Sequence, residues 1–229
     1  MSNLGSTLLF PRADAMPRTI ADRTRRVYDY VAAVYPISTF FFHSKAHKCA
    51  LQISGIRDGM RVLEVATGSG EMLERLVRAN PSGQTIGLDL SPNMAARAQQ
   101  CVRERYPGAS AACQAVDARY MPFRDASFDA VVCCYLLELL SAEDIMVALS
   151  EIRRVLKRRG RLTLVCIGQN ARAFNRAYRV CGRLAPAFWG RQVEERMVEW
   201  LDAADLRVIE DRAVRQGFYP SRVLVAKPS

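Results

Sequence analysis

The sequence predicts a single α/β domain whose seven-stranded sheet is mostly parallel, with an antiparallel last strand and helices on its faces. Two observations predict it. From Arg61 onward, short β-rich runs alternate with helical runs, which is typical of βαβ units. Near the C-terminus, two β-rich runs follow one another with only a short link, and such a link favours antiparallel pairing.

The expected elements follow the chain in order. The parallel strands are expected at 61–66, 84–89, 109–116, 128–134 and 161–167. The helices between them are expected at 71–79, 92–105 and 143–157, and the last segment holds a helix at 192–204 and strands at 206–213 and 218–226. Ser91 and Pro92 are favourable N-cap and N1 residues, so they indicate a helix start directly after Asp89.

The N-terminal part divides into a loose arm, 1–18, and a helical segment, 19–55. A first helix is expected from Thr19 to Tyr35, ending before Pro36 because the residue before a proline disfavours the helical region. A second helix is expected over 38–53. The rest divides into a core, 56–167, a basic helical insertion, 168–192, and a C-terminal helix with strands, 193–229.

Composition favours a soluble protein in a reducing cytoplasm. The chain has 229 residues, 50% of them hydrophobic, and no apolar run long enough to span a bilayer or a convincing secretory signal. The seven cysteines form no C-x-x-C pair, so neither a metal site nor a disulfide framework is expected.

The net charge of +10 is concentrated in one segment. Residues 151–191 hold eleven basic residues and one acidic residue, and the rest of the chain is neutral. Four arginines there share one helical stripe: Arg172, Arg176, Arg179 and Arg183. A basic face backed by an apolar one suits an anionic membrane surface or an anionic acceptor, and it equally suits a solvated helix packed over the domain.

The stretch RVLEVATGSGEML, residues 61–73, runs from a strand through a small-residue turn into a helix. Such a turn lets backbone N–H groups face a ligand, although glycine turns also occur for structural reasons alone. Asp89 ends the next strand, 19 residues after Gly70, and suits the ribose hydroxyls of an adenosine-like ligand. The third glycine of a dinucleotide site would fall at Leu73, whereas Glu64 suits a cationic ligand.

Four segments together resemble one family. They are VLEVATGSGEML, IGLDLSPNMAARA, QAVDARYMPFRDASFDAVVCCYLLELL and ALSEIRRVLKRRGRLTLV. Residues 61–165 resemble a class I S-adenosylmethionine-dependent methyltransferase, in the branch of the quinone-ring C-methyltransferases and bacterial phospholipid N-methyltransferases. The resemblance implies a Rossmann-like sheet and S-adenosyl-L-methionine as cofactor. Ala66 stands at the family's first glycine, and Arg158 and Arg159 replace Pro and Gly in an expected surface loop.

The resemblance also implies roles for residues. Asp89 would hold the ribose, Leu90 and Met94 would flank the adenine, and Asp117 with the Ala118 backbone would recognise the adenine edge. The methionine part would lie over the turn, and the methyl end near the fourth strand. The residues assigned there are Glu64, Ala66, Thr67, Gly68, Gly70, Cys134 and Tyr135. Tyr28 and Tyr35 match a family helix that covers the cofactor, with Tyr35 as the lid residue.

Methyl transfer from a sulfonium needs an aligned nucleophile and no metal, and it needs a base only if the acceptor must lose a proton first. Candidate catalytic residues are Tyr35, His43 and Glu138. His43 and His47 share a helix face that suits an acceptor pocket, or an unremarkable helix surface, which is the favoured interpretation. Glu138 stands where several relatives carry a histidine, and a solvated or structurally paired glutamate fits equally well.

The expected function is methyl transfer to a small-molecule or lipidic acceptor, either a phospholipid amine or a prenylated or aromatic ring. The alternatives are a nucleic-acid methyltransferase, a non-catalytic S-adenosylmethionine-binding protein and a nicotinamide-dependent oxidoreductase. Nucleic acid is disfavoured as a partner because the fourth strand ends in CCYLLE rather than in an Asn- or Asp-Pro-Pro-aromatic turn. The sequence does not identify the acceptor.

Overall fold

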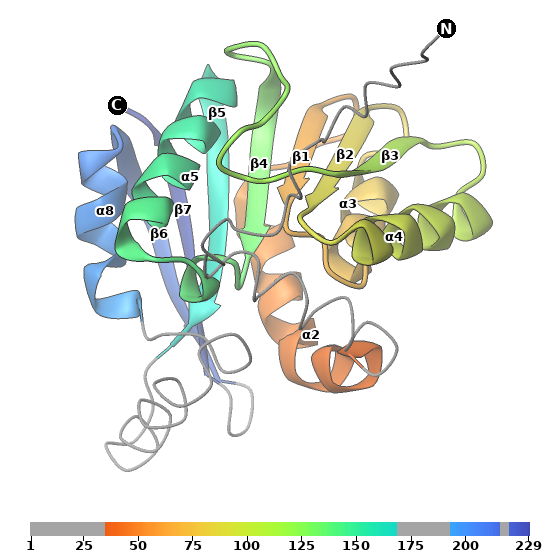
Figure 1. Ribbon diagram of the computed structural model, residues 1–229, viewed down its shortest axis with the longest axis horizontal. Helices are drawn as coiled ribbons and strands as arrows, with labels where there is room; N and C mark the ends of the chain where they lie inside the picture. The colour runs from red at the N-terminus through yellow and green to blue at the C-terminus, as the bar shows by residue number, and fades with distance from the viewer. Residues whose placement is uncertain (1–34, 169–192, 216–219) are drawn as a thin grey trace, which may run out of the picture.

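The computed structural model describes residues 35–168, 193–215 and 220–229 and contains one seven-stranded sheet in the order β3-β2-β1-β4-β5-β7-β6 (Figure 1). The strands are β1 (Arg61–Val65), β2 (Gln84–Asp89), β3 (Ser110–Ala115), β4 (Phe128–Cys134), β5 (Leu156–Ile167), β6 (Leu206–Val214) and β7 (Ser221–Pro228). Only β7 runs antiparallel to its neighbours, β5 and β6. The predicted fold class is therefore confirmed.

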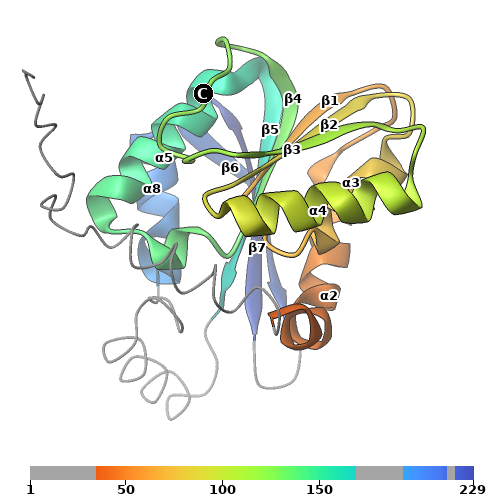
Figure 2. The same cartoon turned by 45° about the vertical axis from the view of Figure 1, so that its right-hand side comes forward.

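Helices cover both faces of this sheet. They are α2 (Tyr35–Ser54), α3 (Glu71–Ala79), α4 (Pro92–Arg105), α5 (Ala142–Val155) and α8 (Met197–Ala203), with short 3₁₀ turns η1 (Leu137–Leu139) and η2 (Glu194–Arg196). In both views α5 and α8 lie toward the β5–β6 side of the sheet, and α3 and α4 lie toward the β3 edge (Figure 1, Figure 2).

Alternating strand residues supply the two cores. On β1, Leu63 packs in the cluster that includes α5 and α8, whereas Val62 packs in the cluster that includes α2 and α3. On β4, Val131 and Val132 separate in the same way. Because consecutive side chains of a strand point to opposite faces, strands covered on both faces read as continuous apolar runs.

The chain leaves β1 toward β2 and β3 on one side, and returns to place β4 on the other. The strand order therefore reverses between β1 and β4. In open α/β sheets, ligands bind beyond the carboxyl ends of the strands at such a reversal. That edge follows Val65, Asp89 and Cys134.

Two boundaries differ from the expectations. Tyr35 and Pro36 both belong to α2, so the helix expected to end before Pro36 does not end there. The strand β5 begins at Leu156 rather than at 161, so Arg158 and Arg159 are exposed strand residues and not a loop. The arm 1–18, most of the predicted helix 19–35 and the arginine stripe in 168–192 lie outside the described residues, so the domain divisions stay predictions.

Candidate functional site

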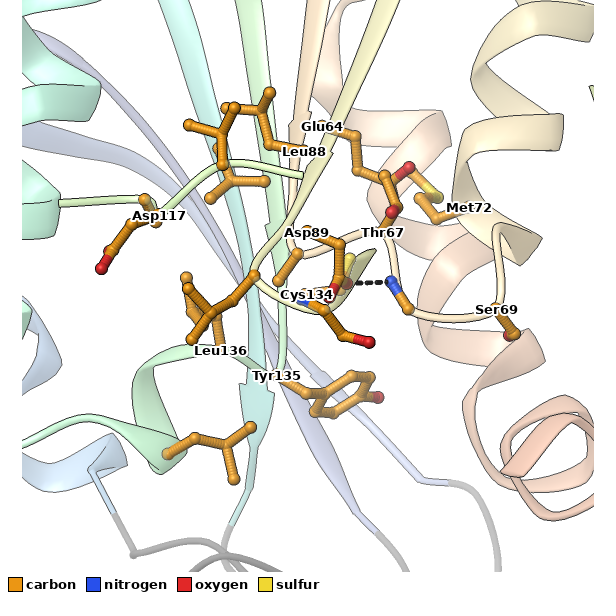
Figure 3. Close-up of a pocket in the computed structure, with 18 of the residues that line it drawn as sticks. Glu64, Thr67, Ser69, Met72, Leu88, Asp89, Asp117, Cys134, Tyr135 and Leu136 are labelled. Carbon is orange, nitrogen blue, oxygen red and sulfur yellow. Dashed lines mark hydrogen bonds between the residues drawn. The ribbon is translucent and has the colours of Figure 1, made fainter. Parts of the chain in front are cut away.

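A pocket opens at the carboxyl edge of β1, β2 and β4 (Figure 3). It encloses about 1140 Å³ when the space at its open mouth is included. Ten predicted cofactor residues line it: Glu64, Ala66, Thr67, Gly68, Asp89, Leu90, Asp117, Ala118, Cys134 and Tyr135. They come from four separate parts of the chain, which the sheet order brings to one edge.

The turn after β1 is built from left-handed backbone. Ala66, Gly68 and Gly70 have φ angles of 63°, 51° and 87°. The Thr67 N–H donates to the Leu88 carbonyl of β2 at 2.9 Å, and the Gly70 N–H donates to the Thr67 carbonyl at 2.9 Å, so β2 and the turn's own backbone fix the turn. Ala66 keeps the glycine-like conformation at an energetic cost that glycine would not have.

Asp89 connects the turn to the next helix. Its Oδ2 accepts a hydrogen bond from the Gly68 N–H at 2.8 Å, drawn in Figure 3, and its Oδ1 accepts one from the Ser91 N–H at 2.9 Å. The Ser91 hydroxyl accepts from the Met94 N–H at 3.2 Å, which confirms the predicted N-cap of α4. The carboxylate at the end of β2 is therefore held by backbone at both oxygens.

Glu64 is a buried acid in the pocket wall, with 1% of its surface exposed. Within the part of the chain that the structure describes, its Oε2 has no hydrogen-bond partner. Burial first, and then the negative charges of Asp89 and Glu71, raise the pKa of Glu64 well above its ordinary value. A cation beside this carboxyl would reverse that penalty, because a nearby opposite charge favours the ionised form.

Asp117 lies at the other side of the pocket in a pair with Arg119. The guanidinium donates to Asp117 Oδ2 at 2.7 Å and to Asp144 Oδ1 at 2.7 Å. Burial raises the pKa of Asp117, but the hydrogen bonds from Arg119 outweigh it and hold the pKa below its usual value. The carboxylate is thus fixed in its charged form between the end of β3 and α5.

Tyr135 follows β4 in a left-handed conformation, with φ of 55°. Its N–H donates to the Val165 carbonyl at 2.8 Å, and its hydroxyl lies 2.7 Å from Ser221 Oγ at the start of β7. Non-glycine residues with positive φ concentrate at functional sites. Burial raises the pKa of the adjacent Cys134 thiol well above its ordinary value, so this cysteine stays protonated at neutral pH.

His47 corrects the favoured interpretation of the histidine pair as helix surface. The side chain is buried, with 6% exposed, and lines the pocket from α2. Its Nδ1 lies 3.7 Å from Glu71 Oε1, and Arg75 donates to the same oxygen at 3.0 Å. The signal in the sequence was the pair of small residues, Ala46 and Ala50, beside His47, and the structure shows that both are fully buried.

Other predicted residues lie elsewhere. Met94 is buried in α4 and Gly70 caps α3, and neither lines the pocket. Glu138 is buried behind the pocket wall, where its Oε1 accepts from the Ile167 N–H at 2.6 Å. Tyr28 lies outside the described residues. Tyr35 and His43 belong to α2, and their side chains lie outside the described part of the structure.

Apart from His47, which was considered for an acceptor pocket, the remaining wall was not predicted. It adds the polar residues His47, Ser69, Glu71, Ser91 and Arg119 and the apolar residues Val65, Met72, Leu88, Val116, Leu136, Leu139 and Leu140. Most of them adjoin predicted residues in sequence, which is the signal that could have found them. Among the described residues, no group of three or more His, Cys, Asp or Glu side chains is placed to hold a metal ion.

Comparison with known proteins identifies the core. Residues 62–160 match the family model described as a methyltransferase domain. The ubiquinone/menaquinone biosynthesis C-methyltransferase of Cellvibrio japonicus is 30% identical over 150 residues, covering 63% of this chain and 59% of that protein. The 2-phytyl-1,4-naphtoquinone methyltransferase of Nostoc is 29% identical over 143 residues, covering 60% and 62%. The chain thus spans about three fifths of the length of these relatives.

Solved structures share the fold. Magnesium protoporphyrin IX methyltransferase from Synechocystis, solved with bound S-adenosylhomocysteine, superposes with a TM-score of 0.74 at 17% identity, covering 92% of this chain and 100% of that one. The cyclase SpnF superposes with a TM-score of 0.76 at 20% identity, covering 92% and 97%. At these identities the likeness concerns the fold alone. On the sequence matches, residues 62–160 form a methyltransferase domain that is similar to those of the quinone C-methyltransferases.

Proposed function

We propose that the protein binds S-adenosylmethionine in this pocket and transfers its methyl group to a small-molecule acceptor. The observation that carries the proposal is the Glu64 carboxyl, which is buried in the pocket wall with one oxygen unpaired among the described residues. A buried carboxyl is costly unless it is paired. A ligand with ammonium and sulfonium charges compensates it, whereas a pyrophosphate would repel it.

The other wall residues suit the remaining parts of the same cofactor. A carboxylate accepts about four hydrogen bonds, so the two backbone bonds to Asp89 are compatible with further bonds from ribose hydroxyls. Leu90, Val116 and Ala118 supply apolar surface near the fixed carboxylate of Asp117, as an adenine ring requires. Cys134 and Tyr135 then border the methyl end. The cofactor supplies the electrophilic methyl group, and the chain holds it and excludes water.

For the acceptor, we propose a prenylated or aromatic ring rather than a phospholipid amine. Two matched relatives are by name quinone methyltransferases. The wall formed by Leu136, Leu139 and Leu140 is apolar, and this suits a ring and its hydrophobic substituent. Nothing in these comparisons favours a nucleic acid as the acceptor.

Contact with an anionic membrane through Arg172, Arg176, Arg179 and Arg183 stays a proposal, since the stripe lies outside the described residues. No described helix is long and apolar enough to cross a bilayer. Co-sedimentation with anionic and neutral liposomes tests the contact, with all four arginines replaced by glutamine in the variant. Equal binding of the variant and the wild type to anionic liposomes contradicts it.

Two measurements test the function. Thermal-shift screening with S-adenosylmethionine, S-adenosylhomocysteine and NAD should show stabilisation by the first two only. Transfer of a labelled methyl group should then occur to the reduced form of 2-phytyl-1,4-naphtoquinone, the compound in a relative's name. Phosphatidylethanolamine vesicles are the competing acceptor, and methylation of their amine alone would contradict the ring proposal.

A further inference from the structure

We propose that His47 is the general base that removes a proton from the acceptor, and that the acceptor therefore carries an acidic O–H or ring C–H. This inference rests on the proposed function and adds the residue that deprotonates the acceptor. It starts from the position of the imidazole: His47 lies on α2, is 6% exposed and lines the pocket. A buried imidazole in a ligand pocket needs a structural or a catalytic reason.

The imidazole borders the part of the pocket where the methyl group is expected. Its ring centroid lies 6.2 Å from that of Tyr135, at an interplanar angle of 49°. Tyr135 is fixed in its turn through the 2.7 Å contact between its hydroxyl and Ser221 Oγ. The two rings thus face one region at the end of β4, next to Cys134.

Charged groups lie beside the imidazole, beyond hydrogen-bond distance of its Nδ1. Glu71 Oε1 lies 3.7 Å from His47 Nδ1, and Arg75 donates to that oxygen at 3.0 Å and to Ser44 Oγ at 2.9 Å. Burial raises the pKa of Glu71, but contacts with His47 and Arg75 outweigh it and keep the pKa below the ordinary value. An anionic Glu71 favours the tautomer with its proton on Nδ1, which makes Nε2 the basic nitrogen. Glu71 is then a positioning residue.

Three acidic residues of the described wall are committed to other contacts. Glu64 belongs to the cationic side of the cofactor site, and Asp89 and Asp117 are held by backbone and by Arg119. The Cys134 thiol stays protonated because burial raises its pKa.

The proposed step moves one proton to His47 and one methyl group to the acceptor. His47 Nε2 takes the proton from the acceptor's O–H or C–H as the acceptor's electron pair forms the new bond to the methyl carbon. The bond between sulfur and methyl breaks, and its electron pair stays on sulfur, leaving neutral S-adenosylhomocysteine sulfur and an imidazolium. A neutral amine acceptor would not need this base.

The test compares His47→Gln, Glu71→Gln and a matched control, Lys48→Gln, whose side chain is exposed on the same helix. With reduced 2-phytyl-1,4-naphtoquinone as acceptor, His47→Gln should lower kcat by about 10²- to 10⁴-fold. Its affinity for S-adenosylmethionine should stay within a few fold of the wild type. The rise of the wild-type rate with pH should disappear in His47→Gln and move in Glu71→Gln. Lys48→Gln should behave as the wild type.

Other outcomes distinguish a failure of the proposed role of His47 from a failure of the proposed function. Unchanged kcat in His47→Gln overturns the proposed role and leaves the proposed function standing. Methylation of phosphatidylethanolamine alone overturns it together with the proposed ring acceptor, and leaves methyl transfer from S-adenosylmethionine standing. If neither acceptor reacts, ¹⁵N spectra of the imidazoles decide, with His47→Gln supplying the assignment. A proton on Nδ1 that shifts toward Nε2 in Glu71→Gln supports the role, and a proton on Nε2 in the wild type overturns it. A wild type that binds no S-adenosylmethionine rejects the proposed function itself.

Discussion

Replacing Gly70 with alanine should destabilise the protein strongly, because both the backbone conformation and the packing at this position require glycine. Its φ is 87°, and a Cβ there would lie 3.1 Å from the Cα and Cβ atoms of Ala98 in α4. The left-handed region costs an L-residue about 1–2 kcal/mol. The lower entropy of the unfolded chain offsets about 0.4–1 kcal/mol of it. Overpacking adds about 1–3 kcal/mol, so Gly70→Ala should lose about 1–5 kcal/mol.

Urea denaturation measures this loss, and thermal unfolding should show a fall in Tm of about 2–20 °C for a domain of this size. Gly68→Ala is the matched control, because its φ is 51° but no atom lies within 4 Å of the added Cβ. It should lose about 1 kcal/mol or less. Equal losses in the two variants would refute the packing argument, and a Gly70→Ala protein as stable as the wild type would refute both parts.

Three further substitutions test how backbone conformation, burial and ion pairs contribute to stability. Ala66→Gly relieves a left-handed alanine with φ of 63°, so urea denaturation should show a gain of about 0.5–1 kcal/mol, and a loss would contradict it. Burial raises the pKa of Glu138 to about 7 from its ordinary 4.5. The protonated form is therefore favoured on folding, and stability should fall as pH rises through about 5 to 8. Glu138→Gln should reduce that fall without abolishing it, because the raised pKa of Glu64 also lowers stability as pH rises. Equal pH slopes of the urea-unfolding free energy in the variant and the wild type would contradict this prediction. Arg119→Ala breaks partly buried bonds to Asp117 and Asp144 and should cost about 1–3 kcal/mol. Arg105→Ala, from an exposed pair with Glu74, should cost under about 1 kcal/mol, and the reverse order in urea would contradict the ranking.

The strands could be predicted from the sequence because both faces of the central strands are buried. The resulting apolar runs, such as 128–134, are distinct from their surroundings, and Ser91 with Pro92 marks the start of α4. The start of β5 could not be predicted, because residues 157–159 are all basic and residues 158 and 159 are exposed. They fall within the register shift between the pairs Phe128–Leu156 and Ala130–Arg161, so their extended form depends on the pairing of β5 with β4 on either side of them.

Some residues of the candidate site could be predicted from the sequence and others could not. Residues at strand ends, such as Asp89, were predicted because topology alone brings the carboxyl ends of parallel strands together. Arg119 and Glu71 were missed because their roles depend on partners distant in sequence, Asp144 and His47. Met94 was expected beside the adenine ring and is buried in α4 without lining the pocket, because helix periodicity shows a buried side but not whether that side faces core or ligand.

Calorimetric titration of S-adenosylmethionine into the wild type, Glu64→Gln and the exposed control Glu104→Gln tests the central claim most directly. Hydrogen bonds to charged groups contribute about 1.5–3 kcal/mol, so Glu64→Gln should bind about tenfold to a hundredfold more weakly. The control should bind as the wild type does. A folded wild type that releases no binding heat, or a Glu64→Gln protein of unchanged affinity, would contradict the account.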